Sequence, residues 1–216
     1  MIKNTLTLLA LSTLAFTRVG IAQKAHTIPF ASSGNCIELA VTNESSTPIS
    51  AVKVEVTNVP PWLRFSATEL RFGAFNAGEE LSATFSFSVD KSAPVGREHT
   101  LSFVITSATG EQWSKEITLS VSPPERFELY QNYPNPFNPS TAISYQLSAA
   151  SKVSLKVFDV LGREVATLAD DERAPGHHQQ SWDASHVSSG MYIYQLTATD
   201  ERGTRQVTRK AMVLLK

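Results

Sequence analysis

The sequence predicts an all-β protein with two antiparallel immunoglobulin-like β-sandwich domains in tandem, placed after an amino-terminal signal peptide. Two observations carry this prediction. Apolar residues recur at every second position in short runs, as in residues 81–89 (LSATFSFSV), and no window keeps the helical period. Clusters of proline, glycine and polar turn residues separate the runs, and the pair Pro123 and Pro124 divides them into two series.

Residues 1–22 have the composition of a secretory signal peptide. Lys3 supplies the positive start, residues 6–16 (LTLLALSTLAF) form a short apolar run, and Ala22 ends a small-residue cleavage site. Cleavage is expected between Ala22 and Gln23. The apolar run is shorter than the roughly 20 residues of a membrane-spanning helix, so we expect export across the inner membrane and no transmembrane anchor.

Residues 23–122 are expected to form the first sandwich. Each strand has one apolar and one polar face, so a second sheet must cover the apolar one. The strands are expected in residues 37–42, 52–57, 81–90, 101–106 and 117–121. Residues 123–126 (PPER) are the expected linker, because adjacent prolines lack amide donors and cannot continue a sheet.

Several turn motifs of the first domain share a pattern with one bacterial family. They are Asn43 after the first strand, residues 60–63 (PPWL), residues 75–79 (FNAGE) and residues 90–96 (DKSAPVG). The pattern resembles that of the bacterial Ig-like NEW3 family, whose members often stand beside carbohydrate-active domains. The resemblance implies an accessory sandwich, and not a catalyst.

Residues 127–216 are expected to form the second sandwich, which opens with a proline- and asparagine-rich arm, residues 127–141 (FELYQNYPNPFNPST). The prolines of the arm forbid a helix and exclude a central strand, while asparagine side chains can satisfy local backbone groups. We therefore predict a rigid, irregular arm. Strands are expected to resume in residues 142–147, 153–159, 164–168, 177–182, 191–199 and 204–215.

A series of landmark residues runs through the second domain in order. They are Asn132, Tyr133, Pro134, Asn135, Pro136, Phe137, Asn138, Pro139, Gly162, Arg163, Trp182, Gly190, Tyr192, Lys210, Met212, Val213, Leu214, Leu215 and Lys216. Together they strongly resemble the type A C-terminal sorting domain of the bacterial type IX secretion system. The main departure is the polar pair Gln179 and Gln180, where that family more often has a β-branched or apolar residue.

The resemblance implies a two-step export route. The amino-terminal peptide would carry the chain across the inner membrane, and the outer-membrane translocon would then recognise the carboxy-terminal domain. A sortase-like peptidase would remove that domain, and the cargo would be released or attached to a surface lipopolysaccharide. The implied location is therefore secreted or on the outer-membrane surface, and the implied partners are the translocon and the peptidase.

The end of the second domain allows two interpretations. Residues 212–215 (MVLL) form an apolar stretch between Lys210 and Lys216. They could present an edge that a partner pairs with or caps, or they could simply complete the core of the sandwich. The sequence leaves both interpretations open.

Composition and motifs argue against several other functions. The chain has 216 residues and a formal net charge of −1, so it lacks the basic excess of a nucleic-acid binder. The single Cys36 excludes an intrachain disulfide.

The five histidines lack metal-ligand spacing, and no nucleophile elbow or phosphate-cradling loop occurs. Residues 170–172 (DDE) are expected as a solvated hairpin tip and not a calcium loop. We expect a non-enzymatic protein without a cofactor.

Two functions remain to be compared. The leading prediction is an exported non-enzymatic protein with an Ig-like binding or structural domain as cargo and a sorting domain as its address. The alternative is a carbohydrate-binding accessory module that uses Trp62 or Trp113, since an exposed indole near a loop–strand junction could stack on a sugar. Exposure of both tryptophans on one face would favour glycan binding, whereas burial would indicate core packing.

Overall fold

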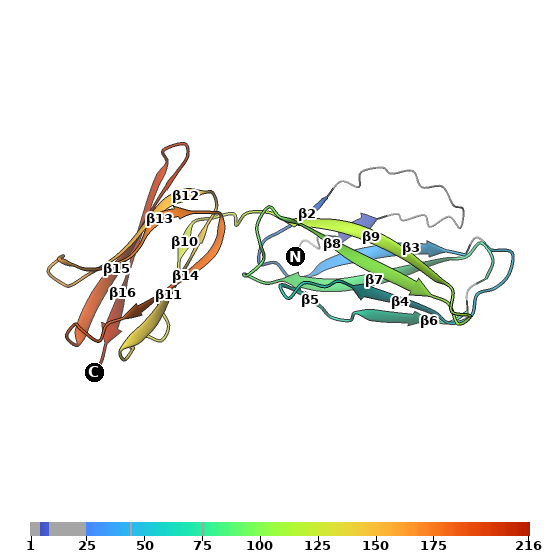
Figure 1. Ribbon diagram of the computed structural model, residues 1–216, viewed down its shortest axis with the longest axis horizontal. Helices are drawn as coiled ribbons and strands as arrows, with labels where there is room; N and C mark the ends of the chain where they lie inside the picture. The colour runs from blue at the N-terminus through green and yellow to red at the C-terminus, as the bar shows by residue number, and fades with distance from the viewer. Residues whose placement is uncertain (1–4, 9–24, 44, 75) are drawn as a thin grey trace. The chain divides into compact units, whose positions relative to one another are not determined.

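A computed structural model describes residues 5–8, 25–43, 45–74 and 76–216. Every regular element in these ranges is a β-strand, so the predicted all-β class is confirmed (Figure 1). The chain divides into two compact units, unit 1 (Met1–Ser122) and unit 2 (Pro123–Lys216). Each unit is a β-sandwich with an apolar core of its own.

The signal-peptide prediction falls mainly outside the described residues. The cleavage site at Ala22 and Gln23 and most of the apolar run belong to residues 9–24, which the structure does not describe. Strand β1 (Thr5–Leu8) lies in the same leader, and its backbone pairs in parallel with β3 (Asn35–Thr42). In the described ranges, no helix has the length and apolar character needed to cross a membrane.

Unit 1 consists of two sheets packed face to face. The first has the order β1–β3–β7–β5, where β7 is Glu80–Val89 and β5 is Leu63–Phe65. The second has the order β2–β9–β8–β4–β6, and these strands are His26–Ile28, Gln112–Val121, Glu98–Thr106, Val52–Thr57 and Glu69–Phe72. Neighbouring strands are antiparallel except in the β1–β3 and β2–β9 pairs. Placing β3, β7 and β5 against β4, β8 and β9 gives the strand order of an immunoglobulin sandwich.

The core of unit 1 follows from strict alternation along its strands. In β3 the side chains of Ile37, Leu39 and Val41 are buried, and the residues between them are half-buried. Phe85 of the first sheet meets Phe103 of the second, with ring centroids 5.3 Å apart. Full burial of one large apolar side chain stabilises a fold by about 1.5–3 kcal/mol, so the contact between the two sheets holds the unit together.

Unit 2 is a sandwich of a three-stranded and a four-stranded sheet. The first has the order β10–β11–β14 and the second the order β13–β12–β15–β16, with every neighbouring pair antiparallel. The strands β10 to β16 are, in chain order, Glu128–Leu129, Ser140–Leu147, Ser151–Phe158, Glu164–Arg173, Gly176–Asp183, Gly190–Asp200 and Arg205–Leu214. Fully buried residues from both sheets fill its core, among them Ile143, Tyr145, Leu155 and Leu196.

Two predictions for unit 2 need correction. The acidic residues 170–172 lie within strand β13 and not at a hairpin tip, because β13 continues to Arg173, which pairs with Ser151 at the start of β12. Their side chains are exposed, as expected for solvated carboxylates. The arm is not irregular throughout, since it includes all of β10 and the first residues of β11.

Candidate functional site

The arm joins the two sheets of unit 2 along one edge of the sandwich. Tyr133 exchanges two backbone hydrogen bonds of 2.9 Å with Ala142 of β11. Further along, the Phe137 amide donates to the Val213 carbonyl and the Leu215 amide donates to the Phe137 carbonyl, both at 3.0 Å. The arm therefore crosses from the three-stranded sheet to β16 and covers the edge of β16 near its end.

Amide side chains strengthen this contact, because the prolines of the arm have no backbone N–H to donate. Gln131 Nε2 donates to the carbonyl of Ala211 at 2.8 Å. The backbone amide of Val213 donates to Asn135 Oδ1 at 2.9 Å. Two polar side chains of the arm thus bind the backbone of β16 directly.

Asn132 organises the arm from within. It is only 2% exposed, and its Nδ2 donates to the Pro134 carbonyl and to Thr141 Oγ1, both at 3.0 Å. The peptide bonds that precede Pro134 and Pro136 are cis, and Pro139 is half-buried. Phe137 is buried, and the remaining members of the series from Asn132 to Pro139 have exposed side chains: Tyr133, Pro134, Asn135, Pro136 and Asn138.

Tyr194 of β15 connects the arm to the core of the four-stranded sheet. Its hydroxyl donates to the Tyr130 carbonyl at 2.9 Å and accepts a bond from the Asn132 amide at 3.0 Å. Burial of the phenol raises the pKa of Tyr194 to about 12. Tyr194 is not among the residues predicted from the sequence as functional, although its inward position on β15 predicts burial and a buried phenol usually has a hydrogen-bond partner.

Three landmark aromatic residues meet beneath the arm. Phe137 is 2% exposed and packs against Trp182, with ring centroids 5.6 Å apart. Trp182 in turn meets Tyr192 edge-on at 5.5 Å, and the Tyr192 hydroxyl donates to the Ser188 carbonyl at 2.6 Å. The structure therefore brings residues from the arm, β14 and β15 into one buried cluster.

The last landmark residues alternate between core and surface. Met212 and Leu214 are fully buried, Val213 and Lys210 are half-buried, and Leu215 is 55% exposed. Of the two interpretations of this stretch, core completion describes Met212 and Leu214. The backbone edge of the same stretch already pairs with the arm.

The final lysine fastens the chain end to the loop between β14 and β15. Lys216 Nζ donates to the carbonyls of Ser185 and Val187, and the Lys216 backbone amide donates to Ser189 Oγ at 3.0 Å. Gly190, another landmark, begins β15 next to this loop. The end of unit 2 is therefore held by its own fold and is not a free tail.

Gly162 and Arg163 shape the turn between β12 and β13. Gly162 has a φ of +79°, a left-handed conformation that glycine adopts without strain. Asp159 Oδ1 accepts bonds of 2.9 Å from the amides of Leu161 and Arg163, and Asp159 Oδ2 accepts from Arg163 Nε at 2.7 Å. These bonds lower the pKa of Asp159, and the bond from the Arg163 amide has the largest effect.

The two tryptophans proposed as glycan contacts in unit 1 do not form an exposed pair. Trp62 is 7% exposed and belongs to the core, with its ring edge-on to His99 at 5.8 Å. Trp113 is half-buried against the same core and lies opposite Ile105. Because His99 and Ile105 lie near opposite ends of β8, the two indoles do not share one binding face.

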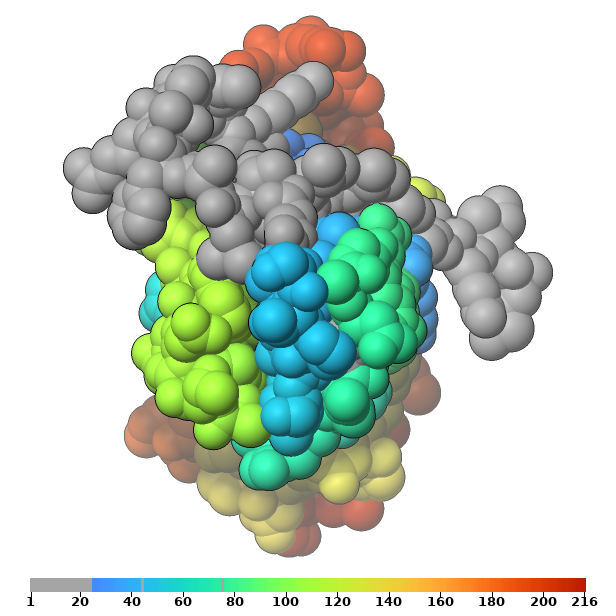
Figure 2. Space-filling model, turned by 90° about the vertical axis from the view of Figure 1, so that its right-hand side faces the viewer, coloured from blue at the N-terminus to red at the C-terminus, as the bar shows by residue number. Residues whose placement is uncertain are grey.

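One end of unit 1 is formed by the loops that follow β3, β6 and β8, and the loop after β3 is bonded to each of the other two. Figure 2 looks onto this end, where blue, teal and yellow-green segments gather: residues 45–51, 76–79 and 107–111. The Gly78 amide donates to the Asn43 carbonyl at 2.7 Å, and the Ala108 amide donates to the Ser50 carbonyl at 3.3 Å. Loops at the ends of immunoglobulin-like sandwiches are frequent binding surfaces.

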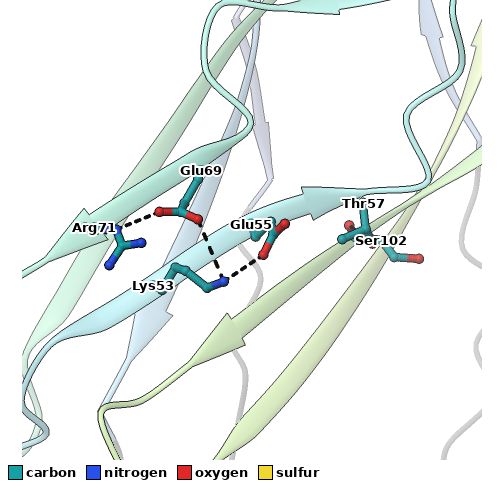
Figure 3. A network of polar contacts seen from close by, with 6 residues as sticks. All are labelled: Lys53, Glu55, Thr57, Glu69, Arg71 and Ser102. Carbon is teal, nitrogen blue, oxygen red and sulfur yellow. Dashed lines mark hydrogen bonds and ion pairs between the residues drawn. The ribbon is translucent and has the colours of Figure 1, made fainter. Parts of the chain in front are cut away.

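A group of charged residues lies on the outward face of β4 and β6 (Figure 3). Lys53 Nζ lies 2.8 Å from Glu55 Oε2 and 3.8 Å from Glu69 Oε2, and Arg71 Nε lies 2.6 Å from Glu69 Oε1. The hydrogen bond to Glu55 is the main cause that raises the pKa of Lys53. Two cations and two anions pair with each other here, so the group has no net charge for a ligand. Within the described ranges, no three His, Cys, Asp or Glu side chains gather as a metal-binding group.

Unit 2 is thus an immunoglobulin-like domain whose edge is sealed by a proline- and asparagine-rich arm and whose end is bound into its own fold. Residues 131–212 match the family model of the secretion system C-terminal sorting domain. The match lies entirely within unit 2. Among curated proteins, none matches the sequence.

Several solved structures share a distant likeness with the chain. The CupB2 chaperone of Pseudomonas aeruginosa has 13% identity and a TM-score of 0.28, with 88% of this chain and 98% of that chain covered. The E. coli chaperone DraB has 16% identity and a TM-score of 0.30, with 90% and 96% covered. Dimeric latent PorU from Porphyromonas gingivalis has 13% identity and a TM-score of 0.35, and the likeness covers 90% of this chain but 19% of PorU. Likenesses this weak carry no argument about function.

Proposed function

We propose that the chain is an exported, non-enzymatic protein in which unit 2 directs outer-membrane translocation by the type IX secretion system. Unit 1 is its Ig-like cargo and acts by binding or as a structural module. The observation that carries the proposal is the sorting-domain match at residues 131–212, which coincides with a separately folded unit. Export signals on such a unit can be added to a cargo without disturbing the cargo's own core.

The route we propose has two steps. The leader, residues 1–22, takes the chain across the inner membrane. The type IX translocon then recognises unit 2, and a sortase-like peptidase removes it at the outer membrane. Unit 1 is released or attached to a surface lipopolysaccharide, so the working protein is secreted or displayed on the cell surface.

The packing of unit 2 supports recognition of a folded domain. Met212 and Leu214 are fully buried, and Lys216 is bonded to the loop between β14 and β15. A partner that read these residues as an extended peptide would first have to open the core, which costs free energy for every buried side chain exposed. Recognition of the folded surface avoids this cost.

The glycan-binding alternative loses its main support. It required exposed indoles on one face, whereas Trp62 is 7% exposed and Trp113 is half-buried on a different part of the sheet. Stacking on a sugar needs an accessible aromatic face. We therefore retain the sorted, non-enzymatic cargo protein as the proposal.

Truncation of the chain tests the proposal. The full chain and a chain that ends at Ser122 are expressed in a host with the type IX system, and in the same host with its translocon disabled. We expect the full chain outside the intact host and the truncated chain in the periplasm. The intact mass of the extracellular product shows whether unit 2 has been removed. Equal export of both chains, or export of the full chain without the translocon, would overturn the proposal.

A further inference from the structure

Large apolar side chains are exposed on unit 2 and not on unit 1, among the residues that the structure describes. Six of them are at least 45% exposed, and all belong to unit 2: Tyr133, Val160, Leu161, Met191, Val207 and Leu215. The outward face of a sandwich sheet is ordinarily polar. A contiguous apolar surface on such a face marks an interaction site more often than single exposed residues do.

Strand register sets two of these six residues, Met191 and Leu215, on one sheet face with three half-buried apolar residues. On the outward face of the four-stranded sheet, Ile193 of β15 lies opposite Phe158 of β12, and Met191 lies opposite Val213 of β16. Leu215 follows on the same face, because the residues that alternate with it are buried. We call these five residues the outer patch. Phe158, Ile193 and Val213 are half-buried, and the other two are 55% exposed.

The rest of the same sheet face is polar and provides an internal comparison. Beyond the outer patch, β15 presents Gln195 and Thr197, and β16 presents Arg205 and Arg209 on either side of Val207. Val207 is 45% exposed but has polar neighbours. The apolar character is therefore confined to the half of the sheet nearest the end of the chain.

A hollow beside the outer patch is lined by both apolar and polar residues. They are Phe158, Val160 and Ile193 together with Asp159, Gly162, Gln195 and Arg209. The carboxylates near this face are already bound, since Asp159 pairs with Arg163 and Glu164 pairs with Lys156. Arg209 donates from Nε to Gln195 Oε1, and no carboxylate of the described residues forms an ion pair with it. Its guanidinium is thus available to an incoming anion.

We infer that the outer patch, with Arg209 at its rim, is the surface through which unit 2 is recognised during export. Its partner is a polypeptide segment of the translocation machinery that carries apolar side chains next to a carboxylate. The apolar groups would cover the outer patch, and the carboxylate would pair with Arg209. This inference rests on the proposed function and adds the surface and the chemistry of the partner.

Substitutions in the full chain test the inference, with extracellular yield as the measurement. We expect Met191→Gln combined with Leu215→Gln to lower the yield about tenfold, because apolar contacts at the centre of an interface carry most of its binding energy. Val207→Gln is the matched control, since Val207 is exposed on the same strand face outside the outer patch. Arg209→Glu should lower the yield, Arg209→Lys should largely preserve it, and Arg205→Glu is the control for charge alone.

Folding is checked by thermal unfolding of each purified variant. Leu215→Gln alone is the variant least able to disturb the fold, because Leu215 lies beyond the end of β16. Wild-type yield from folded outer-patch variants would overturn the inference while leaving the proposed function intact. An equal loss for the Val207→Gln and Arg205→Glu controls would overturn it as well. Export of the wild-type chain without the translocon would instead overturn the proposed function.

Discussion

The two sandwiches seal the same edge with different chemistry. In unit 1, strand β2 pairs with the last strand, β9, by a parallel backbone ladder that includes Ile28 opposite Val121. In unit 2, the arm meets the last strand, β16, where Phe137 lies opposite Leu214. The Gln131 side chain also donates to the Ala211 carbonyl, and the Asn135 side chain accepts from the Val213 amide. Many sequences can form a backbone ladder, whereas side-chain amides must stand at fixed positions. The edge of unit 2 therefore has a sequence signature, and that of unit 1 has none.

The outward sheet faces of the two units also differ in chemistry. On unit 1, charged residues on β4 and β6 pair with each other and leave a neutral, polar face (Figure 3). On unit 2, the outer patch includes two exposed apolar side chains, Met191 and Leu215, and Arg209 lies in the hollow beside it. Unit 2 therefore differs from unit 1 both in the side-chain bonds along its edge and in the apolar residues on its outward face.

The largest effect is expected from truncation of the apolar anchor of the arm. Phe137→Ala should lower the free energy of unfolding of unit 2 by about 3–5 kcal/mol, because it removes a buried ring packed on Trp182. Hydrogen exchange resolved by peptide in the full chain measures the loss in each unit. Ile28→Ala is the counterpart in unit 1 and should destabilise that unit alone. Loss of protection in both units from either variant would contradict two independent cores.

The amide bonds of the arm should contribute less than its aromatic anchor. Asn132→Ala should cost about 1–3 kcal/mol, because it removes the two hydrogen bonds that this buried side chain donates to the Pro134 carbonyl and to Thr141 Oγ1. Asn138→Ala changes an exposed asparagine of the same motif and should stay within about 0.5 kcal/mol of the wild type. Urea denaturation of each variant gives the difference. An equal loss of unfolding free energy in both variants would contradict the stabilising role assigned to the buried Asn132 side chain.

Alkaline pH should destabilise unit 2 before unit 1. The pKa of Tyr194 is raised to about 12 in the folded chain, above the usual value near 10. The folded state keeps the proton that the unfolded state releases, so stability is complete below pH 10 and falls as pH rises towards 12. The loss at pH 11 is about 1 kcal/mol. All five tyrosines lie in unit 2.

Hydrogen exchange at pH values from 8 to 11, corrected for its intrinsic pH dependence, measures the alkaline effect. Tyr194→Phe should start from a lower stability and lose most of the alkaline slope. A slope that survives in Tyr194→Phe would assign it to another group, such as Tyr145, whose pKa is also raised by burial.

The smallest effect is expected from the ion pairs of unit 1. Arg71→Ala removes a bond to Glu69, but the Arg71 side chain is 77% exposed, and exposed pairs contribute little in salt. We expect no resolvable change in thermal unfolding at physiological ionic strength. A clear fall in the unfolding temperature would contradict this expectation. It would show that surface ion pairs contribute substantially to the stability of unit 1.

The sequence located the long strands and none of the short ones, but it began β9 at residue 117 instead of Gln112 and ended β13 at residue 168 instead of Arg173. Residues 81–90 were expected as a strand, and β7 spans Glu80–Val89, because ten alternating residues define a period. Strands β2, β5 and β6 have three or four residues, too few to show one. Their existence depends on the distant strands with which they pair.

The site could be predicted in its local part only. The prolines and asparagines of the arm indicated an irregular segment with satisfied backbone groups, and Asn132 fulfils that expectation. The bond from Gln131 to Ala211 joins residues 80 positions apart, and the partners of Tyr194 lie more than 60 positions away. Such contacts follow from tertiary packing, which no local pattern encodes.

A pair of reporter fusions tests the central claim most directly. A periplasmic reporter is fused at its carboxy-terminal end either to unit 1, residues 25–122, or to unit 2, residues 123–216, and expressed in a host with the type IX system. We expect extracellular reporter for the unit 2 fusion and periplasmic reporter for the unit 1 fusion. Export of both, or retention of a folded unit 2 fusion, would contradict the claim that unit 2 alone carries the address.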